Sequence, residues 1–277
     1  MLLVIDIGNT NTSIGIFEGD NHIADYNLSS DIKKSDDEYG ILLVTILNHH
    51  NLTLKIKGAI ISSVVPQLAE IFTSATAKYL NINPIILSHK SKLPIKLMLE
   101  NNKEIGADRI ANAVAAKIKY TLPAIVIDFG TATTFDIVDK NSNFIGGIIT
   151  PGLKIQAKSL SQFTSKLPKL KIEAPTDVIG KNTISAMLSG IVLGHKCMIE
   201  GMIKKCEEEL NQKATIIATG GYSKVLFDDF DKTVDFVDKH LTLFGLKELY
   251  YLNKEEKYEQ RKSNPEDKKA EQFCFHA

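Results

Sequence analysis

The segment LLVIDIGNTNT, residues 2–12, decides the fold because it returns later in the chain as AIVIDFGTATT, residues 124–134. In each copy, a run of apolar residues typical of a buried strand breaks at an aspartate, and a glycine follows two residues later. Small hydroxyl or amide side chains complete both copies. The two copies lie 122 residues apart in a chain of 277 residues, which indicates an internal duplication.

The same order of elements follows each copy. We predict three antiparallel strands, a helix, a strand, a helix, a strand and a helix in both halves, that is, βββαβαβα twice. The helices are expected at 36–50, 67–80 and 107–120 in the first half, and at 153–167, 222–230 and 241–253 in the second. The fold class is therefore α/β with two related domains, 1–121 and 122–253. Residues 254–277 open with a run rich in both charges and without apolar periodicity, which predicts a disordered tail.

A helix over residues 183–206 is additional to the repeat. Its apolar positions follow a helical stripe, while Gly190 and Gly194 lie four residues apart on one face. Glycine inside a helix costs stability unless something packs against it. The helix is therefore either an internal core helix or one that forms a dimer.

Composition narrows the class of protein. The 33 basic residues balance the 33 acidic ones, so the uniformly basic field of a non-specific nucleic-acid binder is absent. Three cysteines, Cys197, Cys206 and Cys274, form no CxxC pair and indicate a reducing cytoplasm rather than a disulfide framework. The apolar start stops at Ile5, which predicts neither an export signal nor a membrane span.

The two aspartate turns suit phosphate binding. A tight turn with glycine lets backbone N–H groups approach an anion, and the carboxylates of Asp6 and Asp128 can hold a hard cation such as Mg²⁺. A single turn of this composition also arises for conformational reasons alone, but two copies at matching positions favour a grip on a polyphosphate from both sides. A strand that ends at Thr219-Gly220-Gly221 leaves space for the nucleoside end of ATP.

Asp108 and Arg109 begin the predicted helix 107–120. Asp108 is either a favourable first-turn acid or the group that accepts the proton of a hydroxyl attacking the γ-phosphate of ATP. Arg109 would then clamp an anionic end of the substrate.

Five motifs together closely resemble the type III pantothenate kinase family, in the family's order and to about Asn253. They are residues 6–12, 106–109, 128–134, 146–152 and 219–221. The resemblance implies the actin-like and sugar-kinase superfamily, with duplicated ribonuclease-H-like domains and the ATP site in the cleft between them. It also implies ATP-dependent phosphorylation of pantothenate as the first step toward coenzyme A. The implied enzyme is cytoplasmic and homodimeric, and it needs Mg²⁺ and a monovalent cation, K⁺ or NH₄⁺.

The resemblance also assigns roles to residues. The implied first phosphate-binding turn comprises Asp6, Ile7, Gly8, Asn9, Thr10, Asn11, Thr12 and Ser13, with Asp6 near Mg²⁺. Thr131, Gly220 and Gly221 would contact the nucleotide, and Asp128 would hold the monovalent cation. Asp108 would be the general base in a pantothenate pocket lined by Leu99, Gly106, Ala107, Asp108 and Arg109. Thr183 would reach the pantothenate of the neighbouring subunit.

One position departs from the family pattern. The family usually has a tyrosine where this chain has Leu99, so one hydroxyl contact to the substrate is lost. A hydrogen bond to an uncharged group is worth about 0.5–1.5 kcal/mol, and we expect weaker substrate binding with intact chemistry. Two other functions remain open: a nucleotide-binding regulator without turnover, and a kinase for another hydroxyl acid.

Overall fold

The computed structural model describes residues 1–49, 52–227 and 232–263. It divides into two compact units. The first unit comprises Met1–Leu93, Gly106–Asp108 and the chain from Leu246 onward, and the second comprises Pro94–Ile105 and Arg109–Gly245. The predicted boundaries instead divide the chain once, after residue 121. Each unit therefore takes residues from both predicted halves.

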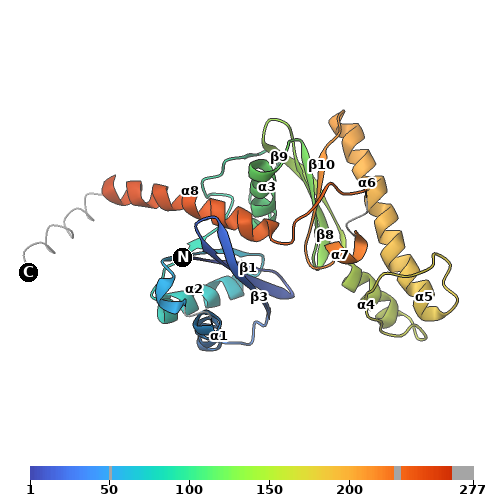
Figure 1. The fold of residues 1–277 in the computed structure, drawn as a ribbon, viewed down its shortest axis with the longest axis horizontal. Coiled ribbons are helices and arrows are strands. Elements are labelled where there is room, and N and C mark those ends of the chain that lie inside the picture. Colours follow the sequence, from blue (N-terminus) through green and yellow to red (C-terminus); the bar gives the residue numbers. More distant parts are fainter. Residues whose placement is uncertain (50–51, 228–231, 264–277) are drawn as a thin grey trace, which may run out of the picture. The chain divides into compact units, whose positions relative to one another are not determined.

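The first unit is built on one mixed sheet (Figure 1). Its described strands have the order β3-β2-β1-β4-β5. They are β1 (Leu2–Ile7), β2 (Asn11–Glu18), β3 (Asn21–Ser29), β4 (Gly58–Ser63) and β5 (Ile85–Ile86). The hairpin pairs are antiparallel, and β1, β4 and β5 run parallel. This is the arrangement expected from the three-strand meander followed by crossover helices.

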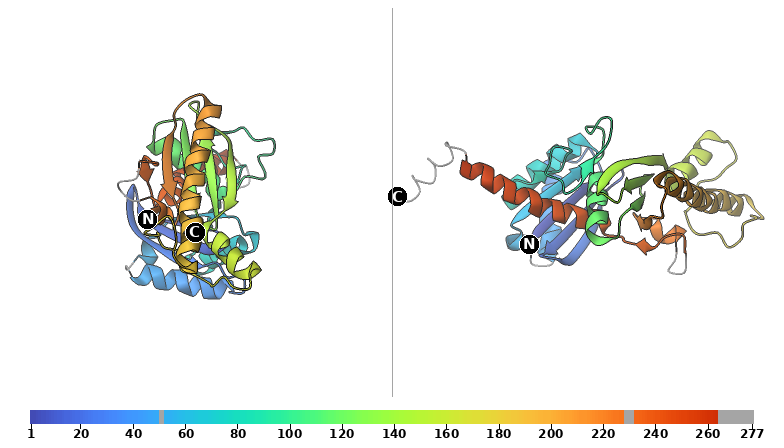
Figure 2. Two further views of the ribbon diagram at one scale, coloured as in Figure 1. Left: turned by 90° about the vertical axis from the view of Figure 1, so that its right-hand side faces the viewer. Right: turned by 90° about the horizontal axis from the view of Figure 1, so that it is seen from above.

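Helices cover both faces of this sheet. The helices α1 (Asp36–His49) and α2 (Pro66–Leu80) bury one face, where Leu3, Ile5 and Ile7 join one apolar core. The helix α8 (Leu241–Ser263) runs over the other face (Figure 2). A Cβ placed on Gly58 would lie 1.8 Å from the Tyr250 hydroxyl oxygen, so this helix packs directly on the strand backbone.

The second unit contains the second sheet. Its described strands have the order β11-β10-β7-β8-β9-β6. They are β6 (Lys96–Leu97), β7 (Ala124–Phe129), β8 (Ala132–Val138), β9 (Asn143–Pro151), β10 (Thr215–Thr219) and β11 (Phe236–Val237). From β9 to β11 the order matches that of the first sheet, and β6 adds a short parallel strand at the β9 edge. The structure thus confirms the predicted duplicated α/β fold.

Helices also cover both faces of the second sheet (Figure 1). The helix α3 (Ala107–Lys119) lies on one face, where Ala115 and Ala116 pack with Val126 and Ile217. The other face is covered by α4 (Leu153–Phe163) and by a long helix in three parts. These parts are α5 (Thr183–Leu188), a π-helical turn (Ser189–Leu193) and α6 (Gly194–Leu210).

The long helix extends beyond its predicted end at Cys206 and stops where Asn211 adopts a left-handed conformation. Taken together, Thr183–Leu210 is long and apolar enough to cross a bilayer by length and composition. Its residues Met187, Ile191 and Ile199 are buried in the core over the second sheet, as in a core helix. Gly190 and Gly194 are exposed on another face, where an added Cβ would meet no described atom within 4 Å.

Three further predicted helices differ in extent by more than one residue. The helix predicted at 153–167 ends at Phe163, where Thr164 has an extended backbone. The helix predicted at 222–230 is a single turn, α7 (Ser223–Leu226), and residues 228–230 lie outside the described part of the chain. The helix predicted to end at Asn253 continues to Ser263 because Lys, Glu, Gln and Arg are good helix formers. It takes in the first part of the predicted tail, whose remainder, 264–277, lies outside the described residues.

Candidate active site

The first aspartate turn joins β1 to β2 in the first unit. The Gly8 N–H donates to the Asn11 carbonyl at 3.0 Å, and the side chains of Asn9, Thr10 and Asn11 are exposed at the tip. Ile7 belongs to the core, so its side chain does not face a ligand. Asp6 is half-buried in the strand before the turn. The turn therefore presents backbone and small polar groups, which suits a phosphate chain.

Two hydroxyls after the turn hold the hairpin together. The Thr12 Oγ1 lies 2.9 Å from the Ser30 Oγ, and the Ser13 hydroxyl donates to the Asn27 Oδ1 at 2.9 Å. Thr12 is fully buried. Thr12 and Ser13, both predicted to contact the nucleotide, thus link β2 to β3 and to Ser30 directly after β3. These links stabilise the hairpin that carries the exposed tip.

The second aspartate turn, in the second unit, is one residue shorter than the first. Ile7 pairs with Thr12, which leaves four residues between them, whereas Phe129 pairs with Thr133, which leaves three. Gly130 and Thr131 are exposed, and the Thr131 carbonyl accepts the Gly152 N–H at 3.2 Å. The junction of β9 and α4 therefore braces this turn.

The carboxylate of Asp128 accepts a hydrogen bond from one helix, and a second helix orients the donor. The Asn112 amide of α3 donates to the Asp128 Oδ2 at 3.2 Å, and the Thr242 hydroxyl of α8 donates to the Asn112 Oδ1 at 2.7 Å. Asn112 is 1% exposed. The sequence prediction missed this residue, although a polar side chain among Ile110, Ala111 and Val114 was the signal for a specific partner.

Gly220 and Gly221 lie directly beside the second turn. Thr219 pairs with Asp128 at the end of β10, and the Tyr222 N–H donates to the Phe129 carbonyl at 3.4 Å. Gly221 is exposed, and an added Cβ there would meet no described atom within 4 Å. The structure therefore brings the predicted nucleoside turn and the predicted cation ligand together within one unit.

Asp108 lies in the first turn of α3 and belongs to the first unit. A Cβ on Gly106 would lie 2.4 Å from the Asp108 Oδ1 and 3.4 Å from a methyl group of Val64. The Val64 N–H in turn donates to the Ile7 carbonyl at 3.1 Å. Asp108 is half-buried, whereas the Ala107 beside it is buried. The carboxylate is thus near the end of β1 that carries the first turn.

Arg109 is held rigidly in the second unit. Its Nε donates to the Asp136 Oδ1 at 2.5 Å, and its Nη2 donates to the Phe135 carbonyl at 3.1 Å. The guanidinium lies over the Phe144 ring, and a Cβ on Gly147 would lie 1.9 Å from its Nη2. Gly147 therefore leaves the space that Arg109 occupies. Asp136 was missed by the sequence prediction, although an aspartate between Phe135 and Ile137 in a strand requires such a partner.

Leu99 and Thr183 are both in the second unit. The half-buried Leu99 follows β6, where the Met98 N–H donates to the Phe144 carbonyl at 2.9 Å, so both Leu99 and Arg109 approach β9. The exposed Thr183 follows Asn182, which caps α5 in a capping box with Ser185. Thr183 lines a groove of about 810 Å³ with Gln156, Met187 and Gly190.

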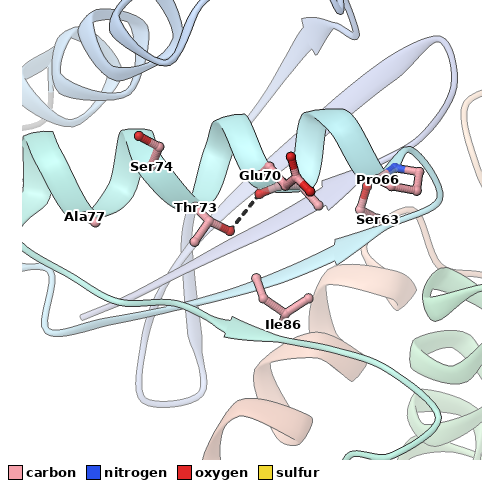
Figure 3. Close-up of a pocket in the computed structure, with 8 residues that line it drawn as sticks. Ser63, Pro66, Glu70, Thr73, Ser74, Ala77 and Ile86 are labelled. Atoms are coloured by element: carbon pink, nitrogen blue, oxygen red, sulfur yellow. Dashed lines mark hydrogen bonds between the residues drawn. The ribbon is translucent and has the colours of Figure 1, made fainter.

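Another groove, of about 630 Å³, lies along α2 in the first unit (Figure 3). Ser63, Glu70, Thr73 and Ile86 are among its lining residues. The Thr73 hydroxyl donates to the carbonyl of Ala69 in its own helix at 2.7 Å. No predicted site residue lines this groove, and it stays outside the candidate site.

The family model described as type III pantothenate kinase matches residues 2–205. Two proteins named type III pantothenate kinase, from Exiguobacterium sp. and Bacillus cytotoxicus, are each 41% identical over 254 residues. That alignment covers 91% of this chain and 99% and 97% of the two relatives, respectively.

Solved structures share the fold at low identity. A putative 2-dehydro-3-deoxygalactonokinase from Sinorhizobium meliloti matches with a TM-score of 0.55 and 12% identity, covering 90% of this chain and 95% of its own. The activator of 2-hydroxyisocaproyl-CoA dehydratase from Clostridium difficile matches with a TM-score of 0.51 and 13% identity, covering 95% and 98%. The fold is thus shared with these two proteins. The family-model match and the 41% identity show that the chain belongs to the type III pantothenate kinase family.

Proposed function

We propose that this chain transfers the γ-phosphoryl group of ATP to the primary hydroxyl of pantothenate, the first step toward coenzyme A. The observation that carries this proposal is the 41% identity to named pantothenate kinases over 91% of the chain. The placement of Asp108 near the end of β1 supports it, because a kinase needs a proton acceptor close to its phosphate-binding turn.

In the proposed reaction, Asp108 accepts the proton of the pantothenate hydroxyl. The hydroxyl oxygen then bonds to the γ-phosphorus, the bond from that phosphorus to the bridging oxygen breaks, and ADP leaves. Arg109 holds the anionic end of pantothenate. Asp136, the Phe135 carbonyl and the Phe144 ring fix the direction of the guanidinium, so little side-chain entropy is lost on binding. Gly106, Ala107 and Leu99 complete the pocket.

The nucleotide and its cations are assigned to the two turns. Gly8, Asn9, Thr10 and Asn11 present backbone and side-chain donors to the phosphates, and Asp6 supplies a carboxylate for Mg²⁺, which prefers oxygen ligands. Thr131 contacts ATP, Gly220 and Gly221 border its nucleoside end, and Asp128 holds K⁺ or NH₄⁺. These oxygen donors fit hard cations, and a bound cation would neutralise charge on the phosphates.

We assign the active enzyme to a cytoplasmic homodimer with a shared pocket. Thr183 reaches the partner's pantothenate, and the face of the long helix that carries Gly190 and Gly194 meets the other subunit. The absence of described atoms within 4 Å of an added Cβ at either glycine supports this, since each mid-helix glycine costs about 1 kcal/mol relative to alanine. The free, exposed Cys197 suits a reducing compartment.

An ATP-to-ADP assay of the purified chain against a panel of hydroxyl acids, with and without K⁺, tests the function. We expect turnover with pantothenate and stimulation by K⁺. Turnover with another acid alone would instead show a different kinase. Nucleotide binding without any turnover would show a regulator.

A further inference from the structure

His195 is a buried ionisable side chain that the proposed reaction does not use. It lies in the first turn of α6, directly after the π-helical turn, and is 3% exposed. Its Nε2 lies 3.0 Å from the Thr133 Oγ1, and its Nδ1 lies 2.8 Å from the Gln156 Nε2. The Phe129 ring meets it edge-on, with centroids 6.3 Å apart. Both ring nitrogens are therefore engaged by side chains of other elements.

The hydrogen-bond chain fixes one tautomer of His195. The Gln156 Nε2 donates to the Pro151 carbonyl at 2.8 Å, so this atom is the amide nitrogen and donates to the His195 Nδ1 as well. The neutral ring must then carry its proton on Nε2 and donate it to the Thr133 Oγ1. Burial lowers the pKa of His195 below its ordinary value of 6.5, which keeps the ring neutral at neutral pH.

The hydrogen-bond chain through His195 connects to the second aspartate turn on two sides. Thr133 pairs with Phe129 and directly follows the turn formed by Gly130, Thr131 and Ala132. On the other side, Pro151 pairs with Ala132 and precedes Gly152, whose N–H donates to the Thr131 carbonyl. His195 thus contacts the strand after the turn directly and the segment that braces the turn through Gln156.

Two features indicate that His195 does more than pack in the core. An apolar side chain would pack against Phe129 without the cost of burying two polar ring atoms. The π-helical turn before His195 departs from the regular hydrogen bonding of an α-helix. Such turns are frequent at functional sites.

We propose that His195 is a positioning residue for ATP binding, which holds the turn Gly130–Ala132 in its phosphate-binding position through Thr133 and through Gln156 and Pro151. The proposal rests on the proposed function in one respect, namely that this turn binds ATP. His195 touches neither substrate, so its removal changes nucleotide affinity and leaves the pantothenate pocket intact.

Three variants isolate the hydrogen bond. His195→Phe keeps a ring against Phe129 and removes both nitrogens, and Thr133→Val keeps the shape and removes the Oγ1. His195→Gln restores an N–H close to the position of Nε2. The matched control is Thr76→Val in the first unit, where a fully buried threonine donates to the Phe72 carbonyl at 2.9 Å.

The measurements are the Kd of a non-hydrolysable ATP analogue by calorimetry, the KM values for ATP and pantothenate, and the Tm. We expect His195→Phe and Thr133→Val each to weaken nucleotide binding about 2- to 12-fold, the range of one net hydrogen bond, with the KM for pantothenate within about twofold. The double variant should bind the nucleotide no more weakly than the single variant with the lower affinity, because both substitutions remove the same hydrogen bond. His195→Gln should recover most of the affinity.

Unchanged nucleotide affinity in Thr133→Val, or an equal loss in Thr76→Val, would overturn the proposal. Thr133→Val decides the matter even if His195→Phe does not fold, because it alters no shape. A wild-type chain that binds the analogue but leaves pantothenate unphosphorylated would refute the proposed function alone. The binding measurements on the variants would still test His195 in that case.

Discussion

The backbone of Gly220 lies against the carboxylate of Asp128. A Cβ on Gly220 would lie 2.4 Å from the Asp128 Oδ1 and 2.6 Å from the Phe129 backbone nitrogen, and the glycine has a φ of 86°. Both the close approach and the positive φ exclude a side chain here. The end of β10 therefore fixes the position of a carboxylate on the neighbouring strand.

Gly220→Ala should displace the Asp128 carboxylate and lower both nucleotide affinity and stimulation by K⁺. Gly19→Ala is the matched control, because Gly19 also has a positive φ, of 58°, but no described atom lies within 4 Å of its added Cβ. It should lower only the Tm. Calorimetric nucleotide binding measures the difference, and equal affinities in the two variants would contradict the contact.

Asp108→Asn should lower kcat by about 10²- to 10⁴-fold while the fold and ATP binding survive, because an amide fills similar space but cannot accept the proton. Asp37→Asn removes another first-turn acid, in α1, and should leave kcat unchanged. Steady-state kinetics on both variants test the assignment. An Asp108→Asn enzyme within twofold of wild type would exclude the general base.

Asp128→Ala should weaken nucleotide binding and abolish stimulation by K⁺, because the proposed cation ligand is lost. Asn112→Ala should weaken the same response, since Asn112 orients this carboxylate at 3.2 Å. Turnover measured across a K⁺ titration, with Na⁺ keeping the ionic strength constant, gives the response. Wild-type turnover that is equal in Na⁺ and K⁺ would show that Asp128 has another role.

Gly194→Leu should weaken dimerisation and activity together. The leucine side chain has room within a single subunit, because no described atom lies within 4 Å of a Cβ added at Gly194. The subunit should therefore keep its fold. Light scattering and turnover on one dilution series should show partial recovery at high protein concentration by mass action. Lys205→Leu, also exposed on α6, is the control for added apolar surface. A fully active monomer would refute the shared pocket.

Acid should destabilise the protein through His195. Burial lowers the pKa of this ring below 6.5, so the unfolded chain takes up a proton before the folded chain does. Stability is therefore lost as pH falls from about 6.5 toward the lowered pKa, by at most about 1.4 kcal/mol per pH unit. His195→Phe should flatten this part of the curve, as measured by urea unfolding between pH 5 and 7.5. An unchanged slope would show that other groups titrate there.

The duplication could be predicted from sequence because buried strands and glycine turns leave local patterns. The lengths of the two turns could not be predicted from sequence. The segments beginning at Asp6 and Asp128 look alike, yet the second turn is one residue shorter. The pairing of both flanking strands sets the turn length, and that pairing depends on the whole sheet.

The assignment of helices to sheets also required the tertiary structure. The apolar stripe of α3 predicts a buried face but does not say which sheet covers it. From Arg109 onward this helix belongs to the second unit, and from Leu246 onward α8 belongs to the first. An amphipathic pattern specifies that a face is buried, whereas its partner depends on the path of the chain.

The sequence by itself identified the glycine and the small polar residues of both turns, because turn chemistry is local. Only the tertiary structure revealed the residues that hold them. Asn112 meets Asp128 across 16 residues, Asp136 meets Arg109 across 27, and His195 meets Thr133 across 62. A polar residue in an apolar run shows that it needs a partner when buried, but folding brings that partner from a distant part of the chain, so only the folded structure names it.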